Sequence, residues 1–167
     1  MDIATHILLV EDEPAIRASV RSYLNDLGYR VSEAADGAQA LELFRCQPPD
    51  LVLCDLRLPR VDGLDVLSAI TAEMPEVPVI VVSGVGSIED SIQSLKRGAW
   101  DYISKPILDF GTLETAILRA LDRARLLKEN REYQTHLERL NGQLTQAIEK
   151  LKEDEEAARV LQLGMLP

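Results

Sequence analysis

Four polar side chains each stand at the end of a separate apolar run, in a pattern that could assemble one reaction site. They are Asp12, Asp55, Ser83 and Lys105, at the ends of runs at 6–10, 51–55, 77–83 and 101–104. In an open parallel α/β sheet, ligands bind at the carboxyl ends of the strands. One sheet edge would then collect an acid pair (Glu11 and Asp12), a lone acid, a hydroxyl and an ammonium. Such a set suits Mg²⁺-dependent transfer of a phosphoryl group onto Asp55, since Mg²⁺ prefers oxygen ligands.

Each of these residues also has an ordinary explanation when taken alone. The acid pair could be solvated turn residues, Ser83 a turn hydroxyl, and Lys105 an exposed loop lysine. Asp55 needs a partner, because an unpaired charge at the end of an apolar run is costly to bury. The occurrence of all of them at successive strand ends favours a common site.

The elements that must position these residues alternate along the chain. Apolar runs lie at 6–10, 30–34, 51–55, 77–83 and 101–104, and amphipathic helical patterns lie at 14–27, 37–46, 63–73 and 87–97, with another from Leu113. The third and fourth runs are almost continuously apolar, as in strands buried on both faces. Repeated βα units predict an α/β fold with a five-stranded parallel, doubly wound sheet.

Beyond about Leu126 the apolar period changes to 3.5 residues. A seven-residue repeat has two positions that face a partner helix. One holds Asn130, Leu137, Leu144, Leu151 and Ala158, and the other holds Tyr133, Leu140, Ala147, Asp154 and Leu161. We call these ten residues the seam. This pattern predicts a long C-terminal helix that forms a coiled coil with a second copy of the chain. Asp154 in the seam and a possible helix stop at Asn141-Gly142 weaken the pattern. We therefore expect two parts, residues 1–121 and residues 122–167.

Composition restricts the classes of partner. The chain has 167 residues and a formal net charge of −10, which argues against binding of nucleic acid by the chain. It has no apolar run near the ~20 residues that a membrane span needs. Cys46 and Cys54 are too few for a disulfide framework or a zinc site, so we expect reduced thiols and a cytoplasmic location.

The pattern DxxxPxxDG at 55–63 and the Lys-Pro pair at 105–106 point to a family. Residues 5–121 resemble the receiver domain of bacterial two-component response regulators, which have a flavodoxin-like fold. The resemblance implies that the chain is a phosphoacceptor and not an enzyme. Asp55 would receive the phosphoryl group of a histidine kinase or phosphotransfer protein.

The resemblance also assigns roles to the other residues. Mg²⁺ would be bound by Asp12, Asp55 and the backbone carbonyl of Arg57, with Glu11 acting through metal-bound water. Lys105 would pair with Asp55 or its phosphate.

Two further residues would respond to the phosphate. Ser83 would hydrogen-bond a phosphate oxygen after movement of the glycine-rich segment 83–86. Tyr102 matches the family's switch aromatic, although a packed strand residue is the alternative.

The output is the least determined part of the sequence. Residues 154–167 resemble the junction before PP2C-like phosphatase domains in regulators of the RssB and RsbU type, so we expect an output domain to follow. That resemblance implies a sigma factor or an anti-sigma-factor antagonist as partner. Two alternatives are a DNA-binding regulator and a Mg²⁺-dependent phosphatase of the haloacid dehalogenase type. The phosphatase class expects an acid at position 57, where this chain has arginine.

Overall fold

Strands and helices alternate along the chain as the apolar runs predict. The computed structural model describes residues 3–84 and 88–165. Its elements are β1 (His6–Val10), α1 (Pro14–Asp26), β2 (Arg30–Ala34), α2 (Gly37–Cys46), β3 (Leu51–Cys54), α3 (Gly63–Glu73), β4 (Val79–Ser83), α4 (Ile88–Lys96), β5 (Asp101–Ser104) and α5 (Phe110–Gly164). The glycine-rich segment 83–86, which we expected to move, lies partly outside the described residues.

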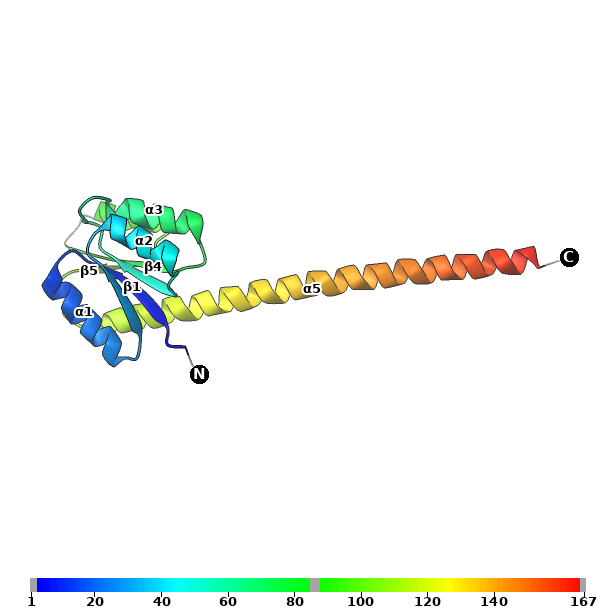
Figure 1. Ribbon diagram of the computed structural model, residues 1–167, viewed down its shortest axis with the longest axis horizontal. Coiled ribbons are helices and arrows are strands. Elements are labelled where there is room, and N and C mark those ends of the chain that lie inside the picture. The colour runs from blue at the N-terminus through cyan, green and yellow to red at the C-terminus, as the bar shows by residue number, and fades with distance from the viewer. Residues whose placement is uncertain (1–2, 85–87, 166–167) are drawn as a thin grey trace. The chain divides into compact units, whose positions relative to one another are not determined.

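The five strands form one parallel sheet in the order β2-β1-β3-β4-β5. The expected five-stranded, doubly wound α/β fold is therefore confirmed. The order reverses direction after β1, since β2 lies on one side of it and β3 on the other (Figure 1). Such a switch point opens a crevice at the carboxyl ends of the central strands.

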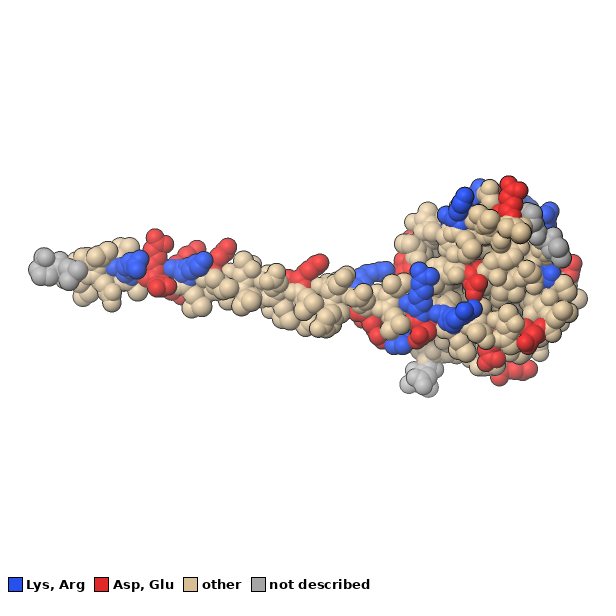
Figure 2. All heavy atoms as spheres, turned by 180° about the vertical axis from the view of Figure 1, so that it is seen from behind, with Lys and Arg blue, Asp and Glu red and all other residues tan. Residues whose placement is uncertain are grey.

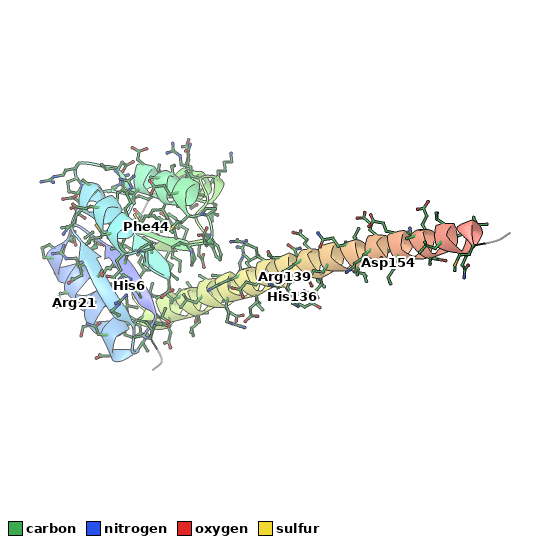
Figure 3. All side chains as sticks on the ribbon, turned by 45° about the vertical axis from the view of Figure 1, so that its right-hand side comes forward. His6, Arg21, Phe44, His136, Arg139 and Asp154 are labelled. Carbon is green, nitrogen blue, oxygen red and sulfur yellow. The ribbon has the colours of Figure 1, made fainter. Side chains whose placement is uncertain are left out.

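Alternate residues of the central strands pack into two separate cores. Leu8, Val52 and Val81 pack with the core under α2 and α3, which includes Phe44, labelled in Figure 3. Ile7, Leu53 and Ile80 pack on the opposite face, where α1 and the first turns of α5 contribute Leu24 and Ile117. Burial of both faces explains why β3 is apolar at every position and β4 at every position except its last residue, Ser83.

Helix ends follow the local sequence. Pro14 begins α1, where its missing N–H is not needed. The Asp36 side chain accepts a 2.8 Å hydrogen bond from the backbone N–H of Gln39 and so caps α2. Gly98 ends α4 with a φ of +107°, a conformation that other residues rarely adopt.

The chain divides into two compact units, residues 1–125 and residues 126–167. The second unit consists of the later part of α5, which includes Asn141 and Gly142 without a break. The possible helix stop therefore does not interrupt the helix, since a single glycine costs a helix only about 1 kcal/mol. The seam residues are exposed in the single chain, Leu137 at 47% and Leu144 at 59%.

No described helix is both long enough and apolar enough to cross a bilayer. On the face seen in Figure 2, basic side chains lie among acidic ones in both units.

Candidate functional site

The carboxyl ends of the strands bring the candidate residues to one edge of the sheet. Glu11 and Asp12 directly follow β1, and Asp55 directly follows β3. The two strands pair in parallel with Val10 opposite Cys54, and the Asp55 N–H bonds the Val10 carbonyl at 3.0 Å. On the other side, the Lys105 N–H bonds the carbonyl of Ser83 at 2.7 Å. Residues distant in sequence are therefore neighbours through backbone register alone.

Three carboxylates gather at this edge. Oxygen atoms of Glu11, Asp12 and Asp55 all lie within 4.8 Å of one another. Glu11 is 3% exposed and Asp55 is 6% exposed, whereas Asp12 is exposed. The cluster thus has a buried floor and an open side.

Lys105 neutralises part of this charge. Its Nζ donates to Glu11 Oε2 at 2.5 Å and to Asp55 Oδ2 at 2.8 Å, and its side chain is 14% exposed. Burial alone would lower the pKa of Lys105, but the hydrogen bonds to Asp55 and Glu11 outweigh it, so that its pKa is raised. The lysine is therefore firmly held as an ammonium between two carboxylates.

Burial has the opposite effect on Glu11. Desolvation raises the pKa of Glu11, while the hydrogen bonds from Lys105 and from the Glu13 N–H oppose that rise. The desolvation effect is the larger one. Further positive charge at this edge would therefore be favourable for the site.

The donor set suits a divalent cation. Three carboxylates and one ammonium leave two negative charges uncompensated when all three acids are ionised, which matches the charge of Mg²⁺. Magnesium usually binds proteins through a few carboxylates and keeps several waters, so an open side is required. Exposed Asp12 supplies that side. The acidic pocket is consistent with Mg²⁺ held by Glu11, Asp12 and Asp55.

The turn after β3 is shaped to hold Asp55. The Arg57 backbone N–H donates to Asp55 Oδ1 at 3.2 Å. Gly63 donates its N–H to the Leu56 carbonyl at 2.8 Å, and a Cβ at Gly63 would overlap the backbone of Asp55 and Leu56. The glycine of the DxxxPxxDG pattern is therefore required by this close approach. The role of the Arg57 carbonyl as a metal ligand stays a prediction.

Ser83 ends β4, and Tyr102 lies in the neighbouring strand β5, where it pairs with Val81. Ser83 is buried at the end of β4, and its contact with a phosphate stays a prediction. The Tyr102 hydroxyl is buried and has no hydrogen-bond partner among the described residues. Burial, followed by the charges of Asp90 and Asp55, raises the pKa of Tyr102.

Sequence analysis missed one residue beside this site. Asp90, in the first turn of α4, lies 3.9 Å from the guanidinium of Arg57, measured from Oδ2 to Nη2. The two residues are far apart in sequence, and no motif connects them. An acid in the first turn of a helix is explained by the helix dipole alone, so the sequence carried no signal for this pair.

Comparisons with known proteins agree with this geometry. Residues 7–118 match the family model described as "Response regulator receiver domain". The chain is 42% identical over 132 residues to the nitrogen assimilation regulatory protein NtrX of Azorhizobium caulinodans, covering 78% of this chain and 29% of that protein. It is 41% identical over 115 residues to the transcriptional regulatory protein ZraR of Escherichia coli, covering 69% and 26%.

Solved structures show the same likeness. A crystal structure of NtrX from Brucella abortus with ADP has a TM-score of 0.72 and 38% identity, covering 76% of this chain and 29% of that one. A receiver domain from Clostridium thermocellum has a TM-score of 0.69 and 31% identity, covering 74% and 98%.

The comparisons correct one expectation. The chain spans less than a third of the length of NtrX and ZraR, both of which are named as regulatory proteins. They do not support the expected resemblance to RssB- and RsbU-type regulators. That resemblance rested on the short segment 154–167, whereas the match to the family model covers residues 7–118.

Proposed function

Because the chain belongs to the response regulator receiver domain family, we propose that Asp55 accepts a phosphoryl group from a histidine kinase and thereby switches the protein's signalling state. The observation that carries this proposal is the environment of Asp55. Its carboxylate is buried, bonded by Lys105 Nζ at 2.8 Å and by the Arg57 N–H at 3.2 Å, and adjacent to an acid pair.

The proposed reaction needs positioning and charge neutralisation. A carboxylate oxygen of Asp55 attacks phosphorus, an O–P bond forms, and the P–N bond to the kinase imidazole breaks with its electron pair leaving on nitrogen. Lys105, already bound to Asp55, offsets the charge of the incoming phosphoryl oxygens. A bound Mg²⁺ would supply further charge neutralisation between the carboxylates and the phosphoryl group. Ser83, at the end of the adjacent strand, would donate its hydroxyl to a phosphoryl oxygen.

The chain is a phosphoacceptor module and not a catalytic enzyme. The hydrolase alternative requires an acid two residues after the nucleophile. Position 57 holds an arginine whose side chain is 83% exposed. We therefore propose a single phosphorylation event per chain, with slow loss of phosphate.

The test is incubation of the full chain with acetyl phosphate and Mg²⁺, followed by intact mass measurement. We expect a mass increase of one phosphoryl group, which Asp55→Asn abolishes and Asp65→Asn, in an exposed acid at the start of α3, does not. Uptake by Asp55→Asn, or rapid multiple turnover of acetyl phosphate, would contradict the proposal.

The segment from residue 122 is proposed to pass the signal on as a coiled coil. Its exposed seam gives one helix an apolar stripe that a single chain does not bury. In a parallel pair, the register would set Lys150 against Glu155 of the second copy, which favours two parallel copies. Residues 1–121 would then be the receiver and residues 122–167 the helical connection.

For the output of the whole protein, the name of the transcriptional regulatory protein ZraR favours control of transcription. This differs from the sigma-factor adaptor or PP2C-like output inferred from residues 154–167. The acidic charge still argues against DNA binding by this chain itself. Reading the gene beyond codon 167 tests the output, since a phosphatase domain there would contradict transcriptional control.

A further inference from the structure

Arg57 connects the phosphoacceptor residue to the first turn of α4. Its backbone N–H bonds Asp55 Oδ1 at 3.2 Å, and its guanidinium lies 3.9 Å from Asp90 Oδ2. Within residues 3–84 and 88–165, Asp90 is the ion-pair partner of this guanidinium. One residue therefore contacts both the site and a separate helix.

The contact between Arg57 and Asp90 is weak. The Arg57 side chain is 83% exposed and that of Asp90 is 35% exposed, and exposed ion pairs contribute little to stability. At 3.9 Å the two atoms are also beyond the 2.7–2.9 Å of a charge-assisted hydrogen bond. A stronger anion nearby would therefore displace Asp90.

Phosphorylation of Asp55 creates such an anion. The phosphoryl group adds a charge of about −2 and three strong acceptor oxygens. Arginine binds phosphate through two parallel hydrogen bonds, a geometry that the present pair with Asp90 lacks. The backbone link of Arg57 to Asp55 keeps the base of the long side chain beside the new group.

Tyr102 provides a second observation at the same place. Its buried hydroxyl lacks a hydrogen-bond partner among the described residues. Burial raises the pKa of Tyr102, the charges of Asp90 and then Asp55 raise it further, and the charge of Arg57 opposes them. Buried polar groups are usually hydrogen-bonded, so the Tyr102 hydroxyl is a donor open to a new acceptor.

We propose that Arg57 is a phosphoryl-responsive latch, whose guanidinium pairs with Asp90 while Asp55 is unmodified and binds the phosphoryl group once Asp55 is phosphorylated. The transfer releases the first turn of α4 from the turn after β3. It also leaves the Asp90 carboxylate as an acceptor for the Tyr102 hydroxyl. This inference rests on the proposed phosphorylation of Asp55.

The experiment compares four full-length chains: wild type, Arg57→Gln, Asp90→Asn and Arg60→Gln. Arg60 is the matched control, because it lies in the same turn and has a similarly exposed side chain paired with Asp36 at 3.7 Å. Each chain is phosphorylated with acetyl phosphate and Mg²⁺. Uptake is followed by intact mass, and amide hydrogen exchange is measured in peptides covering residues 88–96 with and without phosphate.

In wild type and Arg60→Gln, we expect phosphorylation to speed exchange in the first turn of α4 several-fold. In Arg57→Gln and Asp90→Asn, the first turn of α4 should exchange faster than in unphosphorylated wild type even before phosphorylation. Phosphorylation should then change the exchange rate of these variants less than two-fold. Arg57→Gln should also lose its phosphoryl group several-fold faster after acetyl phosphate is removed, whereas Asp90→Asn should not.

Two outcomes separate this inference from the proposed function. Normal uptake by Arg57→Gln with the wild-type exchange response in α4 would overturn the latch alone. Absence of uptake by the wild-type chain would overturn the proposed function, and the latch with it.

Discussion

Lys105 donates a 2.8 Å hydrogen bond from Nζ to Oδ2 of Asp55, across 50 residues of sequence. The same ammonium bonds Glu11 at 2.5 Å, so one cation serves two buried carboxylates. A buried charge that loses its partner is strongly destabilising, because its desolvation is no longer compensated. The pair therefore links the stability of the fold to the chemistry of the site.

Removal of Lys105 should destabilise the protein. We expect Lys105→Ala to lower the free energy of unfolding by about 3 kcal/mol at pH 7, since two adjacent carboxylates lose their counter-charge. The loss should shrink as pH falls, because a Glu11 carboxyl whose pKa is raised further becomes neutral by protonation. Urea unfolding at pH 7 and pH 5 measures both effects. Lys96→Ala, at the exposed end of α4, is the control, and equal losses in the two variants would contradict this prediction.

Mg²⁺ should stabilise the folded chain through the acidic cluster. A ligand that binds only the folded state at 100 times its dissociation constant adds about 2.7 kcal/mol. We expect a rise in melting temperature on addition of MgCl₂ that EDTA reverses. Asp12→Asn should reduce the rise, whereas Asp26→Asn, an exposed acid at the end of α1, should leave it unchanged. A full rise in Asp12→Asn would exclude Asp12 as a ligand.

Replacement by alanine should change the stability of the protein in opposite directions at two glycines. A Cβ at Gly63 would overlap the backbone of Asp55 and Leu56, so Gly63→Ala should cost about 2 kcal/mol or more. A Cβ at Gly142 meets nothing within 4 Å inside α5, so Gly142→Ala should stabilise by about 0.5–1 kcal/mol. Thermal unfolding of the two variants checks both signs. Stability gained by Gly63→Ala would show that the turn is not closed as described.

His6 should make stability depend on pH. Its ring is buried on β1, as labelled in Figure 3, with Nε2 2.7 Å from Ser32 Oγ. Burial, followed by the charge of Arg30, lowers the pKa of His6 below 6.5. The unfolded state then binds more protons, so this stability is present above pH 6.5 and is lost as pH falls through the folded pKa. Unfolding of wild type and His6→Gln from pH 8 to pH 5 should show the loss in wild type alone, and parallel curves would contradict it.

Two substitutions in the seam of α5 should shift self-association in opposite directions. Leu144→Asp places a charge in the apolar seam and should make the chain monomeric. Asp154→Leu removes a charge from the seam (Figure 3) and should tighten the dimer. Light scattering across a concentration series measures both. A wild-type chain that stays monomeric at every concentration would contradict the proposed coiled coil.

The sequence alone determined the order of the elements and the residues that end them. Continuous apolar runs identify buried strands, and the positions of Asp55 and Lys105 directly after two such runs identify the sheet edge. These signals are local or periodic, so they can be recognised in the sequence without knowledge of the fold. The helical period beyond Leu126 predicted the later part of α5 for the same reason.

Only the tertiary structure decided which side chains meet at that edge. It joined Lys105 to Glu11 as well as to Asp55, and it brought Arg57 to Asp90. It also showed that the Tyr102 hydroxyl is buried without a partner among the described residues. Strand register and helix placement set these distances, and both follow from packing of the two cores. Contacts between residues that share no local pattern depend on the whole fold. The sequence therefore predicted which residues form the site but not which of their side chains contact one another.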